Sequence, residues 1–455
     1  MLYLGLIIKS DFTQRMNGLP YDFTDKEVSS WGGLRLIEET YRRSGLKQYL
    51  EENSQDLPVS GSNRGYDPVD LVEGFMVSAI LGATRLAHTG TLRYDKVVQG
   101  IFGWEKGMAS QSTFSRFFRR FDQERNDKLF PAINQFWFSQ LKLDKMTIDV
   151  DSTVITRHGR QDGVEKGYNP KRHGRGSHHP LIAFVAEAKM VANAWMRTGD
   201  SASSTDFTEF FDELLTIIPP DRIGLFRADS GFCHETIMAR LEKENLSYIM
   251  AIRMMAPLVR RIFEHKEWFP IDHGYWTASF EYQAKGWSKP RRIVVVRKDS
   301  GQHPDTGGKL LFPEIEEFEK YKYAAFATNV EFSAELVWQL YNQRADCENR
   351  IRELKYNYGI EGFCMDDFYA TEAAFRWTMV AHNLMSLFRL QVLNTKHQPV
   401  LSTMRFQCIA IGSYLVKSGR KTTLMLSAKQ NRRLFLEGLF EKVSNLSPPF
   451  QISNA

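Results

Sequence analysis

Three carboxylates stand far apart in the sequence, each in a segment that predicts a regular element. Asp151 closes residues 146–151, Asp229 closes residues 223–229, and Glu348 lies in a helical segment. Hard divalent cations such as Mg²⁺ prefer oxygen ligands, and carboxylates add negative charge. Two such ions about 4 Å apart can stabilise both the attacking and the leaving oxygen of a phosphodiester. These residue types therefore predict metal-dependent phosphodiester chemistry, for which folding must bring the three together.

The first of these segments alternates in the manner of a β-strand. Ile148 and Val150 share one face of residues 146–151, and Asp149 and Asp151 share the other. The alternation alone does not choose between the two aspartates.

Glu348 belongs to a polar stripe on a long helix predicted for residues 334–356. At 100° per residue, Tyr341, Arg344, Glu348 and Lys355 fall within about 60° of one another. The adjacent stripe is apolar and should pack on a sheet: Leu336, Leu340, Cys347, Ile351 and Leu354. Polar groups that border a packed face are held in place, which suits a site. The alternatives are a solvated charged face and, for the cations, ion pairs with glutamates of neighbouring turns.

The surrounding elements predict an α/β core with an insertion. Strands are expected at 146–151, 181–188, 190–197 and 223–229, with a helix after Ser204 that ends at Pro219-Pro220. Residues 236 to about 320 are interpreted as an insertion with a β-hairpin over 275–283 and 291–297. The core is expected to resume with a strand at 323–328, and the last hundred residues are expected to be helical. Their basic stretch comprises Lys417, Arg420, Lys421, Lys429, Arg432 and Arg433.

The first 143 residues are predicted to be mostly helical. Two helices over 94–102 and 112–121, with Gly103 and Gly107 between them, suggest a helix-turn-helix. The second helix carries Arg116, Arg119 and Arg120, which would suit a helix in a major groove. An ordinary amphipathic pair with a solvated basic face is the equal alternative.

A basic segment without apolar periodicity follows the first aspartate. Between residues 157 and 180 it holds Arg157, Lys171, Arg172 and Arg175, among other cations, and we expect it to follow a DNA backbone. Its histidines are His158, His173, His178 and His179, and a flexible basic loop is a better interpretation of them than a metal site.

The bulk composition limits the possibilities without deciding among them. The chain has 455 residues, enough for two or three domains, and a formal net charge of +5, which permits a polyanionic partner. The four cysteines show no CxxC spacing, which argues against zinc and a disulfide framework and fits a cytoplasmic protein. No apolar run reaches the length of a membrane span.

Several motifs together resemble the DDE transposases of bacterial insertion sequences. Tyr341-x2-Arg344-x3-Glu348-x6-Lys355 is similar to the Tyr-Arg-Glu-Lys signature of one branch. Asp151-Ser-Thr resembles the first aspartate block of these enzymes, and Asp229-Ser-Gly-Phe the second. Tyr21-Asp-Phe-Thr-Asp-Lys and Gly167-Tyr-Asn-Pro also look like that branch. The resemblance covers roughly residues 145–395 and favours Asp151 over Asp149 as the first ligand.

The resemblance implies a fold and a division of the chain. It implies an RNase H-like core with a mixed sheet, in two parts at 144–235 and 321–395, interrupted by the β-rich insertion at 236–320. A helical DNA-binding region at 1–143 and a helical region at 396–455 would flank this core.

The resemblance also implies residue roles and partners. Asp151, Asp229 and Glu348 would hold two Mg²⁺ ions, with Mn²⁺ as a substitute, and Tyr341, Arg344 and Lys355 would contact DNA phosphates. A tryptophan of the insertion, Trp268, Trp276 or Trp287, would stack on an unpaired base, or simply pack within the hairpin. The enzyme would act as a nucleoid-associated homodimer that cleaves double-stranded DNA at terminal inverted repeats and joins the 3′ ends to a target.

Two other classes of protein remain as alternatives. A non-transposing RNase H-like nuclease or resolvase would keep the carboxylates without needing the phosphate-contacting stripe. A DNA-binding protein descended from a transposase would be expected to have lost a carboxylate, and all three are present.

Overall fold

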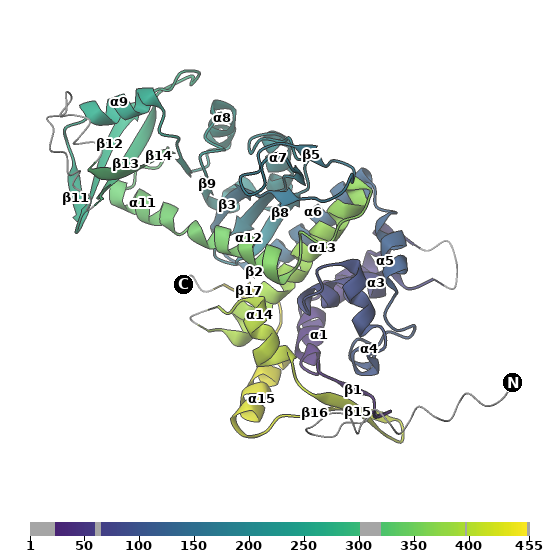
Figure 1. The fold of residues 1–455 in the computed structure, drawn as a ribbon. Coiled ribbons are helices and arrows are strands. Elements are labelled where there is room, and N and C mark those ends of the chain that lie inside the picture. Colours follow the sequence, from purple (N-terminus) through teal and green to yellow (C-terminus); the bar gives the residue numbers. More distant parts are fainter. Residues whose placement is uncertain (1–22, 60–64, 301–319, 396–397, 453–455) are drawn as a thin grey trace, which may run out of the picture.

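The computed structural model describes residues 23–59, 65–300, 320–395 and 398–452, and its centre is a nine-stranded sheet (Figure 1). The strands of this sheet are β3 (Met146–Ser152), β7 (Leu181–Val185), β8 (Met190–Trp195), β9 (Ile223–Ala228), β10 (Tyr248–Ala251), β11 (Phe269–Asp272), β12 (Tyr275–Tyr282), β13 (Arg291–Asp299) and β14 (Tyr321–Thr328). Their spatial order is β11-β12-β13-β14-β10-β9-β3-β7-β8.

Five of these strands form an RNase H-like core. β3, β9 and β10 are parallel, whereas β7 pairs with β3, and β8 with β7, in the antiparallel sense. The helix α7 (Phe207–Ile217) connects β8 to β9, and α8 (Glu235–Lys243) connects β9 to β10. The mixed sheet and the predicted strands that end in or carry aspartate are therefore confirmed.

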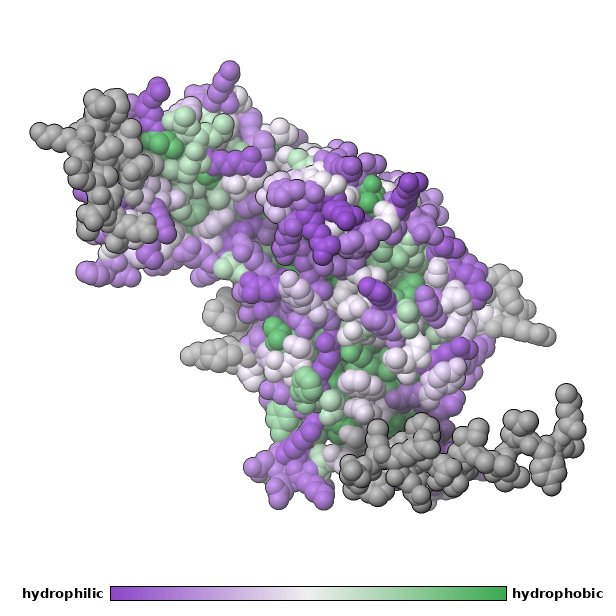
Figure 2. All heavy atoms as spheres, viewed as in Figure 1, coloured by the Kyte–Doolittle hydropathy of each residue, from purple (hydrophilic) through white to green (hydrophobic). Residues whose placement is uncertain are grey.

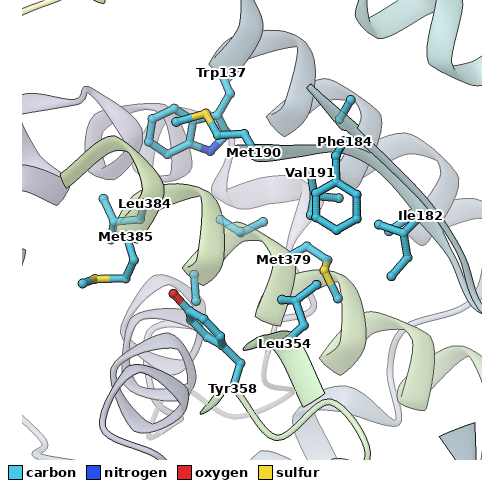
Figure 3. Close-up of a cluster of buried hydrophobic side chains, with 14 of the residues drawn as sticks. Trp137, Ile182, Phe184, Met190, Val191, Leu354, Tyr358, Met379, Leu384 and Met385 are labelled. Carbon is cyan, nitrogen blue, oxygen red and sulfur yellow. The ribbon is translucent and has the colours of Figure 1, made fainter. Parts of the chain in front are cut away.

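The long helix α13 (Phe368–Leu387) lies between the sheet and the N-terminal helices (Figure 1). It is buried from Ala370 to Leu387, as expected for a helix that is covered on every side. Asn383 fixes it to β8, because its side chain accepts from the Val191 amide at 2.7 Å and donates to the Val191 carbonyl at 2.8 Å. Figure 3 shows part of the hydrophobic core, to which Phe184 and Val191 contribute from the sheet, Met379 and Leu384 from α13, and Leu354 and Tyr358 from the region of α12.

The insertion extends the central sheet instead of forming a sheet of its own. The predicted hairpin is confirmed as β12 and β13, and β14 pairs along its whole length with β13 from Arg292 to Asp299. β14 in turn pairs with β10, so that hydrogen bonding is continuous from the insertion to β3. The helix α9 (Ala256–Glu264) lies over this part of the sheet (Figure 1).

The N-terminal region is helical, as predicted, within the described residues. Its α-helices are α1 (Leu34–Arg43), α2 (Leu46–Glu52), α3 (Pro68–Ile80), α4 (Lys96–Phe102), α5 (Gln111–Phe118) and α6 (Gln123–Ser139), with short 3-10 segments η1 (Ser54–Asp56) and η2 (Leu86–Leu92). Gly103 and Gly107 have φ of 78° and 66°, which allows the turn between α4 and α5. Tyr21, in the motif quoted above, lies outside the described residues.

The C-terminal region is only partly helical, which corrects the sequence interpretation. Helical segments are η4 (Phe388–Leu393), α14 (Leu401–Met404), η5 (Arg405–Ile409) and α15 (Gln430–Ser444). Between them, β15 (Ser413–Ser418) and β16 (Lys421–Leu426) form a hairpin that pairs with β1 (Val28–Ser29). Half of the predicted basic stretch thus lies on or beside a β-hairpin, and this hairpin of the C-terminal region shares a sheet with the N-terminal strand β1.

Two small sheets complete the structure. β17 (Phe450–Gln451) pairs with β2 (Leu141–Lys142), and β4 (Ile155–Thr156), β5 (Glu165–Lys166) and β6 (Gly176–His178) form a three-stranded sheet beside β3. The second of these includes residues 165–166 and 176–178 of the basic segment, and hydrophilic residues gather over this region in Figure 2. Within the described ranges, no helix combines the length and apolar character that a membrane span requires.

Candidate active site

The helix predicted for residues 334–356 is broken in the middle. It consists of α11 (Ala334–Asn342) and α12 (Ala345–Asn357). In a continuous helix the Arg344 amide would donate to the Leu340 carbonyl, but here it donates to Tyr341 at 2.9 Å. The Leu340 carbonyl instead accepts from the Arg227 guanidinium. The break therefore has a cause in a strand more than a hundred residues away.

Asp149 is engaged by the same arginine. Arg227 Nε lies 2.6 Å from Asp149 Oδ1, and Nη2 lies 2.8 Å from Oδ2, in a bidentate pair buried between β3 and β9. Both oxygens of Asp149 are thus already paired, which leaves Asp151 as the aspartate available at the end of β3.

Asp151 lies near the end of β3, and Asp229 follows β9, the neighbouring parallel strand, so that the two carboxylates influence each other. Each carboxylate accepts from a nearby backbone amide at 2.8 Å, Asp151 from Ser152 and Asp229 from Gly231. Burial raises the pKa of Asp151 to about 6, and repulsion from Asp229 and Glu348 adds to this, while Arg344 opposes it. A carboxyl in this position binds a proton or another cation readily.

Glu348 and Asp229 line one cleft of about 610 Å³. Glu348 is on the first turn of α12, with its side chain 64% exposed. Ser152 and Ser203, whose hydroxyls are 2.9 Å apart, lie on the same cleft. The fold therefore gathers at one opening residues that are separated by up to about 200 positions in the chain.

A cation from the protein itself lies among the carboxylates. Arg344 Nη2 is 3.1 Å from Asp151 Oδ2, and Nη1 is 3.6 Å from Glu348 Oε1. Arg344 is almost fully buried and also donates to the Val150 carbonyl at 3.1 Å. Among the described residues, no three acidic, histidine or cysteine side chains converge closely enough to hold a metal ion as they stand. The donor types nevertheless fit a hard divalent cation, and Arg344 would have to give up part of its contacts to one.

The other two residues of the predicted stripe, Tyr341 and Lys355, are both partly buried. Lys355 lines the cleft, and its ammonium group donates to the Val154 carbonyl at 2.7 Å and lies 3.3 Å from Glu361. Tyr341 packs against Phe326 with ring centroids 4.5 Å apart, and burial raises its pKa to about 12. Their predicted contacts with phosphates stay predictions.

Two further residues of α12 line the cleft and were not singled out by the sequence analysis. Arg352 and Tyr356 are both exposed, and they follow Glu348 at successive intervals of four residues. The helical period that selected the stripe would have included Arg352.

The basic segment is divided by the structure into an exposed and a buried part. Lys171, Arg172 and Arg175 are exposed, and the first two line the cleft. Arg157 is buried, which corrects its assignment to the DNA-facing cations. It donates through Nε to His178 at 3.0 Å and through Nη1 to the Glu361 carbonyl at 2.6 Å, so these two donors serve the fold.

The histidines of this segment do not form a metal cluster. His178 and His179 are buried and hydrogen-bonded to the carbonyls of Asp162 and Ser201, respectively, and burial lowers the pKa of both. His158 lies on the cleft, 3.4 Å from Arg172. Glu165–Lys166 and Gly176–His178 of this segment belong to the small sheet, and the remaining residues form the turns and loops that connect its strands, as the predicted loop requires.

The three tryptophans of the insertion occupy different surroundings. Trp268 and Trp276 flank the Arg297 guanidinium, whose central carbon lies 4.2 and 5.4 Å from their ring centroids. Trp287 lies near the Arg291 guanidinium and borders a separate pocket of about 440 Å³ with Cys233 and Met255. A role in base stacking is untested for all three.

The candidate DNA-reading helix α5 has an apolar and a basic side. Phe114, Phe117 and Phe118 are buried, whereas Arg116, Arg119 and Arg120 are exposed. Arg119 lies 3.2 Å from Asp366 in an exposed ion pair, and such pairs contribute little stability. Arg116 on α5, and Arg119 and Arg120 just beyond its C-terminal end, are therefore accessible to a polyanion, and the role of this region in reading DNA stays a prediction.

Comparison with known proteins gives one match at the level of a family. A family model described as "Transposase DDE domain group 1" matches residues 13–448. No curated protein matches the sequence. Among solved structures, the cryo-EM structure of the piggyBac transposase synaptic complex with hairpin DNA is similar with a TM-score of 0.42 and 12% identity. That match covers 90% of this chain and 79% of the other.

Proposed function

Since the chain belongs to the DDE transposase family, we propose that it binds the terminal inverted repeats of an insertion sequence, cleaves the DNA there and joins the 3′ ends to a target. The observation that carries this proposal is the cleft that Asp229 and Glu348 line, with Asp151 beside it and cations around it. Such an enzyme works where its DNA is, in the cytoplasm with the nucleoid, and we propose that it acts on double-stranded DNA as a homodimer.

The proposed reaction has two steps of the same type. In the first, a water oxygen forms a bond to phosphorus, the bond to the 3′ oxygen breaks, and a free 3′-hydroxyl remains. In the second, this hydroxyl attacks a phosphodiester of the target, so one phosphodiester is exchanged for another. Neither step needs an oxidant or a reductant.

Asp151, Asp229 and Glu348 would hold the divalent ions, for which Mg²⁺ is the natural choice and Mn²⁺ a substitute. Bound ions would supply charge stabilisation and an activated nucleophile. The backbone amides of Ser152 and Gly231 orient the two aspartates, so that their free oxygens keep a defined direction. Glu348, on an exposed helical turn, can change rotamer to complete the set.

The cations around the cleft would neutralise the DNA backbone. Lys171, Arg172 and Lys355 line the opening, and Arg352 adds a charge from α12. Lys355 is held by the Val154 carbonyl, so it presents its charge at a fixed place beside the carboxylates. Together they supply an attraction that depends on salt but not on DNA sequence. Sequence recognition would then fall to the basic side of α5.

Cleavage of a labelled duplex that ends in the element's own repeat tests the proposal. Wild type and the variants Asp151→Asn, Asp229→Asn and Glu348→Gln are compared with Mg²⁺. We expect cutting at the repeat boundary by wild type alone, with repeat binding retained in the variants. Cutting that ignores the repeat would instead identify a general nuclease, and binding without cutting by wild type would identify a DNA-binding protein.

A further inference from the structure

Two tyrosines reach the catalytic cleft without a partner of their own. Tyr168, between β5 and β6, is 73% exposed, and Tyr356, near the end of α12, is 69% exposed. Both line the cleft that contains Asp229 and Glu348. Within the part of the chain that the structure describes, neither ring contacts another aromatic ring or a cation, and neither hydroxyl makes a hydrogen bond.

The backbone beside Tyr168 is held in place although its side chain is exposed. Asn169 is buried, and its side chain donates through Nδ2 to the Thr156 hydroxyl at 3.0 Å and accepts through Oδ1 from the Arg172 backbone amide at 3.0 Å. On the other side, Gly167 lies so close to the Gly199 carbonyl that a Cβ there would be 2.0 Å from the oxygen. An exposed ring on a fixed backbone loses little freedom when it binds a ligand.

Tyr356 is fixed in the same manner by its helix. Leu354, two residues before Tyr356, is fully buried in the core, and the adjacent Lys355 donates to the Val154 carbonyl. Tyr356 and Arg352 are four residues apart and therefore adjacent on the exposed side of α12.

Single exposed aromatic residues are common and need no explanation. Here, however, two lie on one cleft, interleaved with Lys171, Arg172 and Arg352. Aromatic rings set among cations are the pattern by which proteins hold single-stranded nucleic acid, because the rings stack on bases while the cations neutralise phosphates. In paired DNA the base faces are covered by their neighbours, so a ring can stack fully only on an unpaired base.

We propose that Tyr168 and Tyr356 form a stacking site for unpaired bases beside the phosphodiester that is cut. The inference rests on the proposed function for the identity of the nucleic acid, and it deepens that function. The site would hold the DNA end after the strands separate locally, and it would tolerate different base identities, because every base has a face to stack on.

Binding measurements in an Asp229→Asn background test the site without cleavage. Two DNA probes share one sequence: in the first, three bases next to the cut position are unpaired, and in the second they are paired. A 2-aminopurine among the unpaired bases reports stacking by loss of fluorescence. We expect Tyr168→Ala and Tyr356→Ala each to weaken binding of the unpaired probe by about 10-fold and to quench the 2-aminopurine fluorescence less than the parent does. Binding of the paired probe should change by less than about twofold.

The matched variants separate stacking from other effects. Tyr168→Phe and Tyr356→Phe keep the ring and should bind the unpaired probe as the parent does. Phe406→Ala removes a ring that is exposed elsewhere, on the C-terminal region, and should change neither probe. If the alanine variants lose the same affinity for both probes, the tyrosines make ordinary contacts with the DNA backbone and the proposal is wrong. The proposal is also wrong if they lose no affinity for either probe.

Failure of the proposed function has a different signature. Suppose that wild type neither recognises the terminal repeat nor cuts it, but that the alanine variants of the two tyrosines still bind the unpaired probe selectively more weakly. The stacking site is then supported, and the proposal that its substrate is the transposon end is wrong. If cutting at the repeat is normal in all the tyrosine variants and no probe distinguishes them, the stacking proposal alone is wrong.

Discussion

Arg227 and Asp149 form a bidentate ion pair at directly paired positions of β9 and β3, with N–O distances of 2.6 and 2.8 Å. Each side chain is only 2% exposed. The same guanidinium donates to the Leu340 carbonyl, where the helix is broken between α11 and α12. One pair thus joins the centre of the sheet to the turn that places Arg344 and Glu348.

This arrangement predicts that substitution of Asp149 mainly reduces stability, whereas substitution of Asp151, on the same face of the strand, mainly abolishes cleavage. Removal of one partner of a buried ion pair leaves an uncompensated charge, so Asp149→Ala should lower the free energy of unfolding by about 3–5 kcal/mol. Asp151→Asn removes a carboxylate whose pKa is already raised by burial, and it should cost less than about 1 kcal/mol while abolishing cleavage. Urea unfolding of both variants measures this, and equal losses of stability would contradict it.

The position of Arg344 predicts that this side chain lowers the affinity of the site for a divalent ion. Its guanidinium lies 3.1 Å from Asp151 and 3.6 Å from Glu348, so it repels an incoming cation. Arg344→Gln should therefore strengthen Mn²⁺ binding by about 10-fold, measured by calorimetry without DNA. Cleavage by this variant should nevertheless fall, because the same guanidinium also anchors α12 to the Val150 carbonyl.

Lys355→Gln is the control for the Arg344 experiment. Like Arg344→Gln, this substitution removes a positive charge close to the carboxylates. The Lys355 ammonium group, however, contacts the Val154 carbonyl and Glu361. Mn²⁺ affinity should change less in this variant than in Arg344→Gln. If both variants gain equally, the effect is one of overall charge and not of the contact between Arg344 and the carboxylates.

The small sheet of β4, β5 and β6 should weaken in mildly acidic solution. Burial, and then repulsion from Arg157, lowers the pKa of His178 to about 4 in the folded protein, below the value of about 6.5 expected after unfolding. A lowered pKa means that the folded state favours the neutral ring. Its contribution is therefore complete above pH 6.5 and is lost as the pH falls toward 4, by roughly 3 kcal/mol at most.

Unfolding free energies of wild type and His178→Gln between pH 4 and 7 check this prediction. The glutamine side chain can accept from Arg157 and does not titrate in this range. The difference between the two proteins should depend on pH within the window from 6.5 to 4, where wild type loses stability. A difference that is constant across this window would show that His178 is not responsible.

The sequence contained the strands of the site but not the break in its helix. Ile148 and Val150 alternate with Asp149 and Asp151, and this local pattern correctly predicted β3. The stripe from Tyr341 to Lys355 predicted a helix, and both halves of it exist. The interruption arises from Arg227, whose donation to Leu340 is a contact between distant segments and leaves no local mark in the sequence.

The burial of Arg157 was also not predictable from the local sequence. Arg157 stands in a segment rich in glycine, histidine and cations, which favours a solvated loop. Its partners are His178 and the Glu361 carbonyl, and the second lies 204 residues away in the chain. The C-terminal hairpin, by contrast, had a local signal that was overlooked: Gly419, with φ of 59°, lies between two segments of equal length that pair with each other.

The tryptophans of the insertion should separate into structural and accessible residues. Arg297 lies 4.2 Å from the Trp268 ring and 4.3 Å from the Tyr321 ring, so these side chains stabilise one another. Trp268→Ala and Arg297→Ala should each destabilise the protein, and the double variant should reveal a coupling of about 1–2 kcal/mol. Trp287 borders an open pocket, and its removal should cost less stability. If an insertion tryptophan contacts DNA, Trp287→Ala should lose the most cleavage activity for the smallest loss of stability. A Trp268→Ala variant that folds normally but fails to cleave would instead assign the DNA contact to Trp268.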